Sequence, residues 1–72
     1  MKTKYVMAQR KDASGNVEKV KIDDGTIISK EQVISELLRG QRFIAKYPNG
    51  DEKLVVTNGE KIWVEDIMGV GS

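Results

Sequence analysis

Residues 28–40 read ISKEQVISELLRG, the clearest helical stretch of the chain and the one that decides the fold. Ser29 is a good N-cap, and Gln32, three residues later, predicts a capping box. Apolar side chains recur at helical spacing and predict one buried stripe: Val33, Ile34, Leu37 and Leu38. Gly40 suits the left-handed residue that ends a helix. The stretch therefore predicts a helix of about ten residues, roughly 30–39, which is too short to be stable alone in water and must dock on a sheet.

Alternating apolar and polar residues on both sides of this helix predict short β-strands. We expect three strands before the helix and three after it, over residues 5–10, 17–22, 26–28, 42–47, 52–57 and 60–65. Turn residues separate them at Asp23-Asp24-Gly25, Pro48-Asn49-Gly50 and Asn58-Gly59. The predicted fold is α+β and mostly β. It comprises an N-terminal β-hairpin plus a short strand, one helix, and a C-terminal three-stranded antiparallel meander, with room to curl into a partly open small barrel.

The length of 72 residues allows one small domain, which we place at residues 1–68, with a flexible tail at 69–72. Twelve Lys and Arg face eleven Asp and Glu, and the net charge of +1 argues against a protein that coats nucleic acid by bulk charge. No apolar run approaches the ~18 residues of a membrane span. With no Cys in the chain, we expect a cytoplasmic protein without a membrane contact.

The composition offers little chemistry for catalysis. The chain has no His and no Cys, so the usual acid–base and nucleophilic arrangements and the soft-ligand metal sites are excluded. Adjacent carboxylates occur only beside turns or strand ends, where water solvates them: Asp23-Asp24, Asp51-Glu52 and Glu65-Asp66. We therefore predict a protein that is not an enzyme, with no catalytic residue, no metal and no cofactor.

The pairing register of the C-terminal meander decides which side chains share a surface, because a one-residue slip moves a whole strand to the other face. A three-residue loop at 48–50 sets Lys46 opposite Glu52, and we favour it because a two-residue loop sets Lys46 opposite Lys53. With an odd-length loop at Asn58-Gly59, one face then carries Ile44, Leu54, Val56, Ile62 and Val64. The other face carries Phe43, Tyr47, Lys53, Val55, Lys61 and Trp63. In the two-residue alternative, the first face instead gains Phe43 and Ala45.

The second of these faces carries the predicted binding site. We expect a non-catalytic small binding module that contacts a protein partner through Tyr47, Val55 and Trp63, because exposed aromatic residues are common binding hot spots. One alternative is single-stranded nucleic-acid binding, in which aromatic rings stack on bases and lysines follow phosphates: Phe43, Tyr47, Trp63, Lys53 and Lys61. Another is a structural homodimer sealed through a sheet edge. The competing interpretation is that Phe43 and Trp63 are core residues beneath the helix.

A basic cluster falls on the predicted N-terminal hairpin: Arg10, Lys11, Lys19 and Lys21. Exposed lysines on edge strands commonly protect the edge and keep a protein in solution, and we favour this interpretation of the cluster.

The stretch from Val20 to Gly25, VKIDDG, is followed by Ser29-Lys30-Glu31 and by an apolar helix that stops at Gly40. This arrangement resembles a small bacterial and phage family, the domain of unknown function numbered 3892. The similar features are the strand, the Asp-Gly turn, the helix start and the glycine stop, over residues 17–40. The resemblance implies an accessory protein of bacterial or phage type, and it brings no activity and no catalytic residue.

Overall fold

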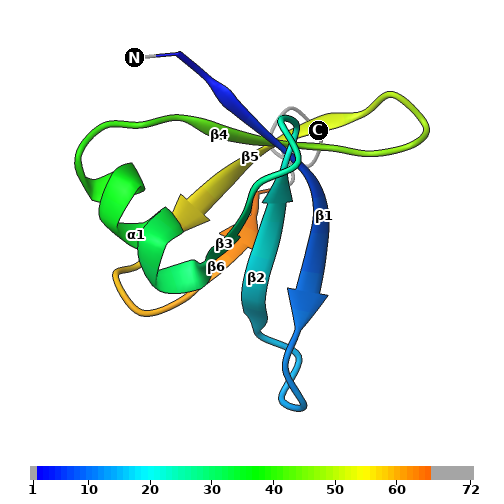
Figure 1. The fold of residues 1–72 in the computed structure, drawn as a ribbon. Coiled ribbons are helices and arrows are strands. Elements are labelled where there is room, and N and C mark those ends of the chain that lie inside the picture. The colour runs from blue at the N-terminus through cyan, green and yellow to red at the C-terminus, as the bar shows by residue number, and fades with distance from the viewer. Residues whose placement is uncertain (1, 66–72) are drawn as a thin grey trace, which may run out of the picture.

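The computed structural model describes residues 2–65 (Figure 1). Within these residues the elements are β1 (Lys4–Lys11), β2 (Val17–Ile22), β3 (Ile27–Ser29), α1 (Lys30–Leu38), β4 (Phe43–Lys46), β5 (Glu52–Thr57) and β6 (Ile62–Val64). The predicted α+β, mostly β class and the order of the elements are confirmed, with ends that differ by one or two residues. The expected domain end at 68 and the expected tail at 69–72 lie outside the described residues.

All the described strands form one sheet in the order β3-β2-β1-β4-β5-β6. Strands that follow each other within each half pair antiparallel, as predicted for the hairpin and for the meander. β1 and β4 pair in parallel, with Tyr5 opposite Ile44 and Val6 opposite Ala45. The protein is thus two three-stranded halves joined through their first strands. The sheet curls, but its order ends at β3 and β6, so it is not closed into a barrel (Figure 1).

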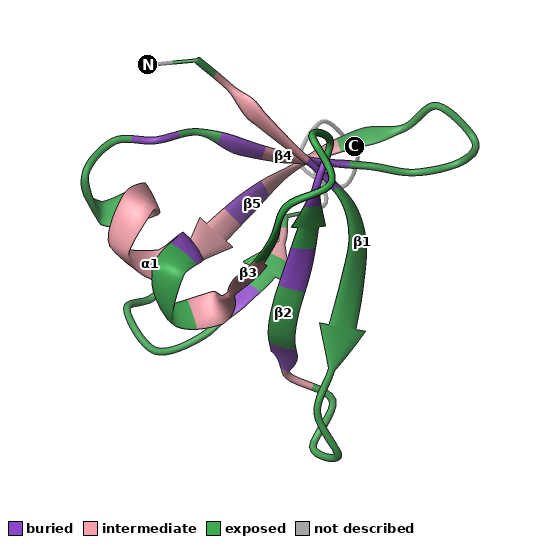
Figure 2. Cartoon of the chain, viewed as in Figure 1, coloured by how far each residue is buried: buried purple, intermediate pink, exposed green. Residues whose placement is uncertain are grey.

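The inner side of the curled sheet forms the hydrophobic core together with α1 (Figure 2). Val33 from α1 is fully buried there. The first half of the sheet contributes Val6, Val17, Val20 and Ile22, and the second half contributes Phe43, Ala45, Val55 and Ile62. Leu38 is 71% exposed, so its predicted place in the buried stripe is wrong. At 3.6 residues per turn it lies about 140° around the helix from Val33, beyond the face that docks.

Local hydrogen bonds explain where α1 begins and ends. The Gln32 amide donates to Ser29 Oγ at 3.3 Å, which confirms the N-cap. The Gln32 side chain donates to Glu36 Oε2 at 2.7 Å instead of returning to Ser29, so the predicted capping box forms only half. At the other end Gly40 has φ +100°, and the Gln41 amide donates to the Glu36 carbonyl at 2.9 Å. This closure ends the helix at Leu38, one residue earlier than predicted.

The β4–β5 register is the one predicted. Lys46 pairs with Glu52 and Ile44 with Leu54, across a loop in which the Tyr47 amide donates to the Asp51 carbonyl at 2.9 Å. Gly50 takes φ +94°, as a three-residue loop with a glycine bulge requires.

The β5–β6 register differs from the prediction. Thr57 pairs with Ile62 and Val56 with Trp63, so four residues rather than an odd number separate the strands. Side chains hold this longer loop: Asn58 Oδ1 accepts from the amides of Glu60 and Lys61 at 2.9 and 3.0 Å. The Thr57 hydroxyl donates to the Lys61 carbonyl at 2.7 Å. The extra residue turns Trp63 to the face of Val56 and turns Ile62 to the core.

Candidate binding surface

The structure separates the six residues of the predicted binding face. Phe43 is fully buried and Val55 is 5% exposed, and both belong to the core. Neither side chain is open to a partner, so the predicted contact of Val55 and the predicted base stacking of Phe43 are wrong. Trp63 is 45% exposed and lies on the opposite face of the sheet, because it pairs with Val56. Each of the two interpretations of these rings is thus right for one of them: Phe43 is in the core, and Trp63 is at the surface.

Three of the predicted residues still meet at one place. A hollow of about 330 Å³ between the β1–β2 turn and β6 is lined by residues that include Tyr47, Lys61 and Trp63, together with Lys11 and Asn16. Lys53 lies nearby, with Nζ 5.5 Å from the centroid of the Tyr47 ring. Ile62 and Val64 also line this hollow, and the Trp63 side chain lies on the opposite face of β6 from theirs. The rings of Tyr47 and Trp63 therefore do not form two neighbouring surfaces for base stacking.

The outer face of the sheet carries a different apolar surface, which we call the outer strip. It consists of Tyr5, Ile44, Leu54, Val56 and Trp63. Side chains directly opposite each other in a sheet share a face, and these pair as Tyr5 with Ile44, Ile44 with Leu54, and Val56 with Trp63. Four of the five are half-buried and Trp63 is exposed. Because α1 packs on the inner side, it does not cover this strip.

Charges near the outer strip are mixed and partly neutralised. Lys46 Nζ lies 5.1 Å from the centroid of the Tyr5 ring and 3.8 Å from Glu52 Oε2. The Glu65 amide donates to the Leu54 carbonyl at 2.8 Å, which places a second acidic residue beside the strip. Lys53 pairs with Ala45 on the inner face, whereas Lys61 lies in the β5–β6 loop and lines a hollow together with Trp63. Of the two lysines expected beside Trp63, Lys53 is therefore on the other face of the sheet.

Sequence alternation had grouped Ile44, Leu54 and Val56 correctly, but it placed Ile62 rather than Trp63 beside them. The length of the loop after Thr57 was the deciding signal, because one more residue in it moves Trp63 to this group. The contribution of Tyr5 depends on the parallel β1–β4 pairing, for which no local pattern exists.

Two carboxyl groups have shifted titration, and neither lies on the outer strip. The Lys4 ammonium and then the Gln32 amide hydrogen-bond to Glu36 and lower the pKa of that carboxyl. Hydrogen bonds from Thr26 lower the pKa of Asp24, whose Oδ1 accepts from the Thr26 amide at 2.8 Å. Both carboxylates have local structural roles, as a tie between β1 and α1 and as part of the β2–β3 turn. Within residues 2–65, no three acidic, His or Cys side chains gather in a way that could hold a metal ion.

In comparisons with known proteins, no family model, no curated protein and no solved structure matches the chain. The resemblance over residues 17–40 is thus neither supported nor contradicted. In the described part of the chain, no helix is long and apolar enough to cross a membrane.

Proposed function

We propose that this domain is a non-catalytic binding module that docks on an apolar, weakly charged surface of another protein through the outer strip. The observation that carries the proposal is the position of Trp63, 45% exposed beside half-buried apolar neighbours on a sheet face that α1 does not cover. The accessory role implied by the resemblance to a bacterial and phage family fits such a module.

An exposed tryptophan among partly buried apolar residues has the make-up of a binding hot spot. Its large ring loses much water-exposed area when a partner covers it, and the neighbours keep water away from the contact. Val56 lies directly opposite Trp63, and Leu54 is on the same face two residues along β5. These three side chains form a continuous apolar centre with charged groups at its margin.

The charges around the strip favour a protein over single-stranded nucleic acid. Nucleic-acid binding depends on Lys and Arg side chains that are free to neutralise phosphates and so release the counterions bound to the nucleic acid. Lys46 beside the strip is paired with Glu52, and Glu65 adds a negative charge next to Leu54. A nucleic acid stacked on Trp63 would therefore meet the carboxylates of Glu52 and Glu65 as well as Lys61, which lines a hollow with Trp63.

A photo-crosslinking side chain introduced at position 63 tests the proposal directly. The matched control carries the same group at position 38, where Leu38 is an exposed apolar residue on α1 and outside the strip. We expect a discrete protein adduct from position 63 that is absent from position 38. The captured protein, once purified, should shift the amide resonances of Val56 and Leu54 and leave those of α1 unchanged.

Two further measurements separate the alternatives. Titration with a short single-stranded DNA, followed by Trp63 fluorescence at low and at physiological salt, should give no saturable quenching. Quenching that fades with salt would favour the nucleic-acid alternative. Elution volume should not depend on protein concentration, whereas a concentration-dependent dimer that crosslinks through position 63 would make a second copy of this chain the occupant.

A further inference from the structure

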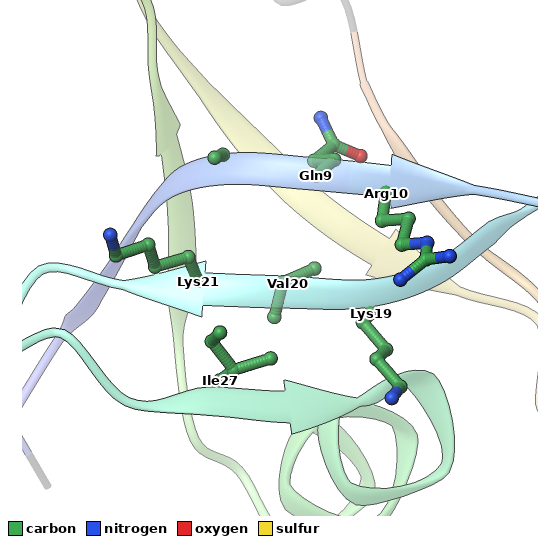
Figure 3. A pocket seen from close by; sticks show the side chains of 7 residues that line it. Gln9, Arg10, Lys19, Val20, Lys21 and Ile27 are labelled. Carbon is green, nitrogen blue, oxygen red and sulfur yellow. The ribbon is translucent and has the colours of Figure 1, made fainter.

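The outer face of the first half of the sheet contains a second hollow, of about 290 Å³, lined by side chains of β1, β2 and β3 (Figure 3). Arg10 and Lys19 extend from neighbouring strands at one end of it and Lys21 lies at the other end (Figure 3). Ala8 and Ile27 flank Lys21 on the neighbouring strands and supply apolar surface. No acidic residue and no aromatic residue lines this hollow.

The cations of this hollow are placed against each other. Arg10 pairs directly with Lys19 across the β1–β2 ladder, and Lys21 is the next residue of β2 on the same face. Like charges directly opposite each other destabilise a sheet. The ion pairs of the described residues, such as Lys4 with Glu36 and Lys46 with Glu52, do not include these three cations, so no carboxylate among residues 2–65 forms a salt bridge with them. An anionic ligand would remove this repulsion.

The third feature is the free edge of β3. β3 is the last strand of the sheet and pairs only with β2 among the described strands. The Ile22 amide donates to the Thr26 carbonyl at 2.8 Å, and hydrogen-bonded pairs alternate along an antiparallel ladder. The backbone N–H and C=O of Ile27 therefore point away from β2. The Ile27 side chain is 64% exposed beside them.

We infer that this hollow and the β3 edge together dock an extended peptide segment in which every second side chain is in turn acidic and aliphatic, so that both kinds lie on the outer face of the sheet. The segment adds a strand to β3, with its backbone and an aliphatic side chain on Ile27 and its carboxylates on Lys19 and Lys21, whose long side chains extend across β3 from the next strand. Strand addition to an open edge, with specificity from alternate side chains, is a common mode of peptide recognition. The absence of aromatic rings from the lining favours a peptide over stacked bases.

This peptide site is separate from the outer strip, and each can fail without the other. Trp63, Val56 and Leu54 do not line this hollow, and Arg10, Lys19 and Lys21 do not belong to the strip. The assignment also gives the basic cluster of the N-terminal hairpin a role beyond edge protection.

The test uses the full chain, labelled with ¹⁵N, and as the probe a blocked peptide of two Glu-Ser-Val-Ser repeats, which presents Glu and Val on the same face of a strand. We expect saturable shifts of the amides of Arg10, Lys19, Lys21 and Ile27, and slower hydrogen exchange of the Ile27 amide. The same peptide with Lys in place of Glu should give no shifts, and the peptide with Ser in place of Val should bind at least about tenfold more weakly because it lacks the aliphatic contact. Unchanged exchange at Ile27 would overturn strand addition.

Charge reversal supplies the matched variants. Lys19→Glu should weaken binding of the Glu-Ser-Val-Ser peptide at least about tenfold, since it removes one cation and places a carboxylate in the hollow. Lys61→Glu makes the same change in net charge on an exposed residue outside the hollow and should leave the affinity within about twofold. Equal losses in both variants would overturn the site in favour of general charge attraction. A ten-nucleotide oligo-dT that shifts the same amides while the peptide does not would overturn it in favour of a phosphate ligand.

Discussion

The first half of the sheet, β1–β3, and the second half, β4–β6, each bury four apolar side chains against α1 but present different outer faces. The outer face of the first half carries Arg10, Lys19 and Lys21 around a little aliphatic surface. The second half carries the outer strip, and its Lys46 is paired with Glu52. The two halves share one interior through the β1–β4 pairing, so we expect stability to depend on the whole sheet, whereas the two proposed binding surfaces lie on different halves.

The largest effect should come from the shared interior. Phe43→Ala removes a fully buried ring and should lower the free energy of unfolding by about 3–5 kcal/mol. Ile27→Ala, on the outer face and 64% exposed, should cost about 1 kcal/mol or less. Urea denaturation followed by far-UV circular dichroism measures both.

A small domain has little stability to lose, so Phe43→Ala is expected to leave much of the chain unfolded. Phe43→Leu keeps an apolar side chain in the same place and should cost about 1 kcal/mol, which keeps the comparison measurable. Equal costs for Phe43→Ala and Ile27→Ala would contradict the division into a shared interior and separate outer faces.

Corresponding turns of the two halves should respond alike. Gly25 lies between β2 and β3 with φ +90°, and Gly59 lies between β5 and β6 with φ +95°. A Cβ added at either position meets no atom within 4 Å, so the cost of Ala comes from the backbone conformation alone. Gly25→Ala and Gly59→Ala should each lower the free energy of unfolding by about 1–2 kcal/mol, measured by urea denaturation.

Asn at the same positions provides the control, because Asn tolerates the left-handed conformation better than Ala. Gly25→Asn and Gly59→Asn should each recover part of the loss. A large cost at one turn and none at the other would show that the two halves do not contribute equally to folding.

Local signals in the sequence were enough to predict the elements of both halves. Ser29 and Gly40 have the conformations that caps require, and Gly50 occupies its predicted turn, because each is determined by neighbours in the chain. The parallel β1–β4 pairing had no local signal, since it joins Tyr5 to a residue almost forty positions later. The way the two halves combine was therefore beyond a reading of patterns.

The candidate site depended on a single non-local choice. The sequence leaves Trp63 open between the surface and the core, and the structure exposes it; its predicted neighbours are wrong because the loop held by Asn58 and Thr57 is longer than Asn-Gly alone. The longer loop puts Val56 beside Trp63 and leaves Lys53 on the opposite face, whereas Lys61 still lines a hollow with Trp63. Turn chemistry predicted that a loop was present, whereas the side-chain hydrogen bonds that set its length appear only in the folded chain.

The ion pair between Lys4 of β1 and Glu36 of α1 should make the free energy of unfolding depend on pH in the acid range. Lys4 Nζ lies 2.7 Å from Glu36 Oε1, and the resulting hydrogen bond is the main cause of the lowered pKa of Glu36. Because the folded-state pKa of Glu36 is below the usual 4.5, this ion pair contributes fully to the free energy of unfolding above pH 4.5. The contribution is lost as the pH falls through the folded-state pKa. Because Lys4 is 41% exposed, we expect a contribution below about 1 kcal/mol.

Glu36→Gln removes this titration and should flatten the dependence of the free energy of unfolding on pH below 4.5, measured by urea denaturation at a series of pH values. Part of the slope should remain below pH 3.8, because Asp24 also has a pKa below its usual value of 3.8. An unchanged slope in Glu36→Gln would show that the tie between β1 and α1 does not persist in solution.

The smallest expected change in the free energy of unfolding is an increase, whereas the variants above all lower it or leave it unchanged. Lys19→Glu replaces the like-charge pair with Arg10 by an opposite-charge pair on the outer face of the first half, and should raise the free energy of unfolding by about 0.2–1 kcal/mol. Lys21→Glu is the matched control, since Lys21 pairs with Ala8 and Ile27 and has no cation across either ladder. The gain of Lys19→Glu should shrink in high salt, because exposed charges are screened. If Lys19→Glu folds more stably and yet binds the acidic peptide more weakly, then Lys19 serves recognition at a cost to stability. A lowered urea midpoint, or an equal gain from Lys21→Glu, would mean that Arg10 and Lys19 do not repel each other in the folded sheet.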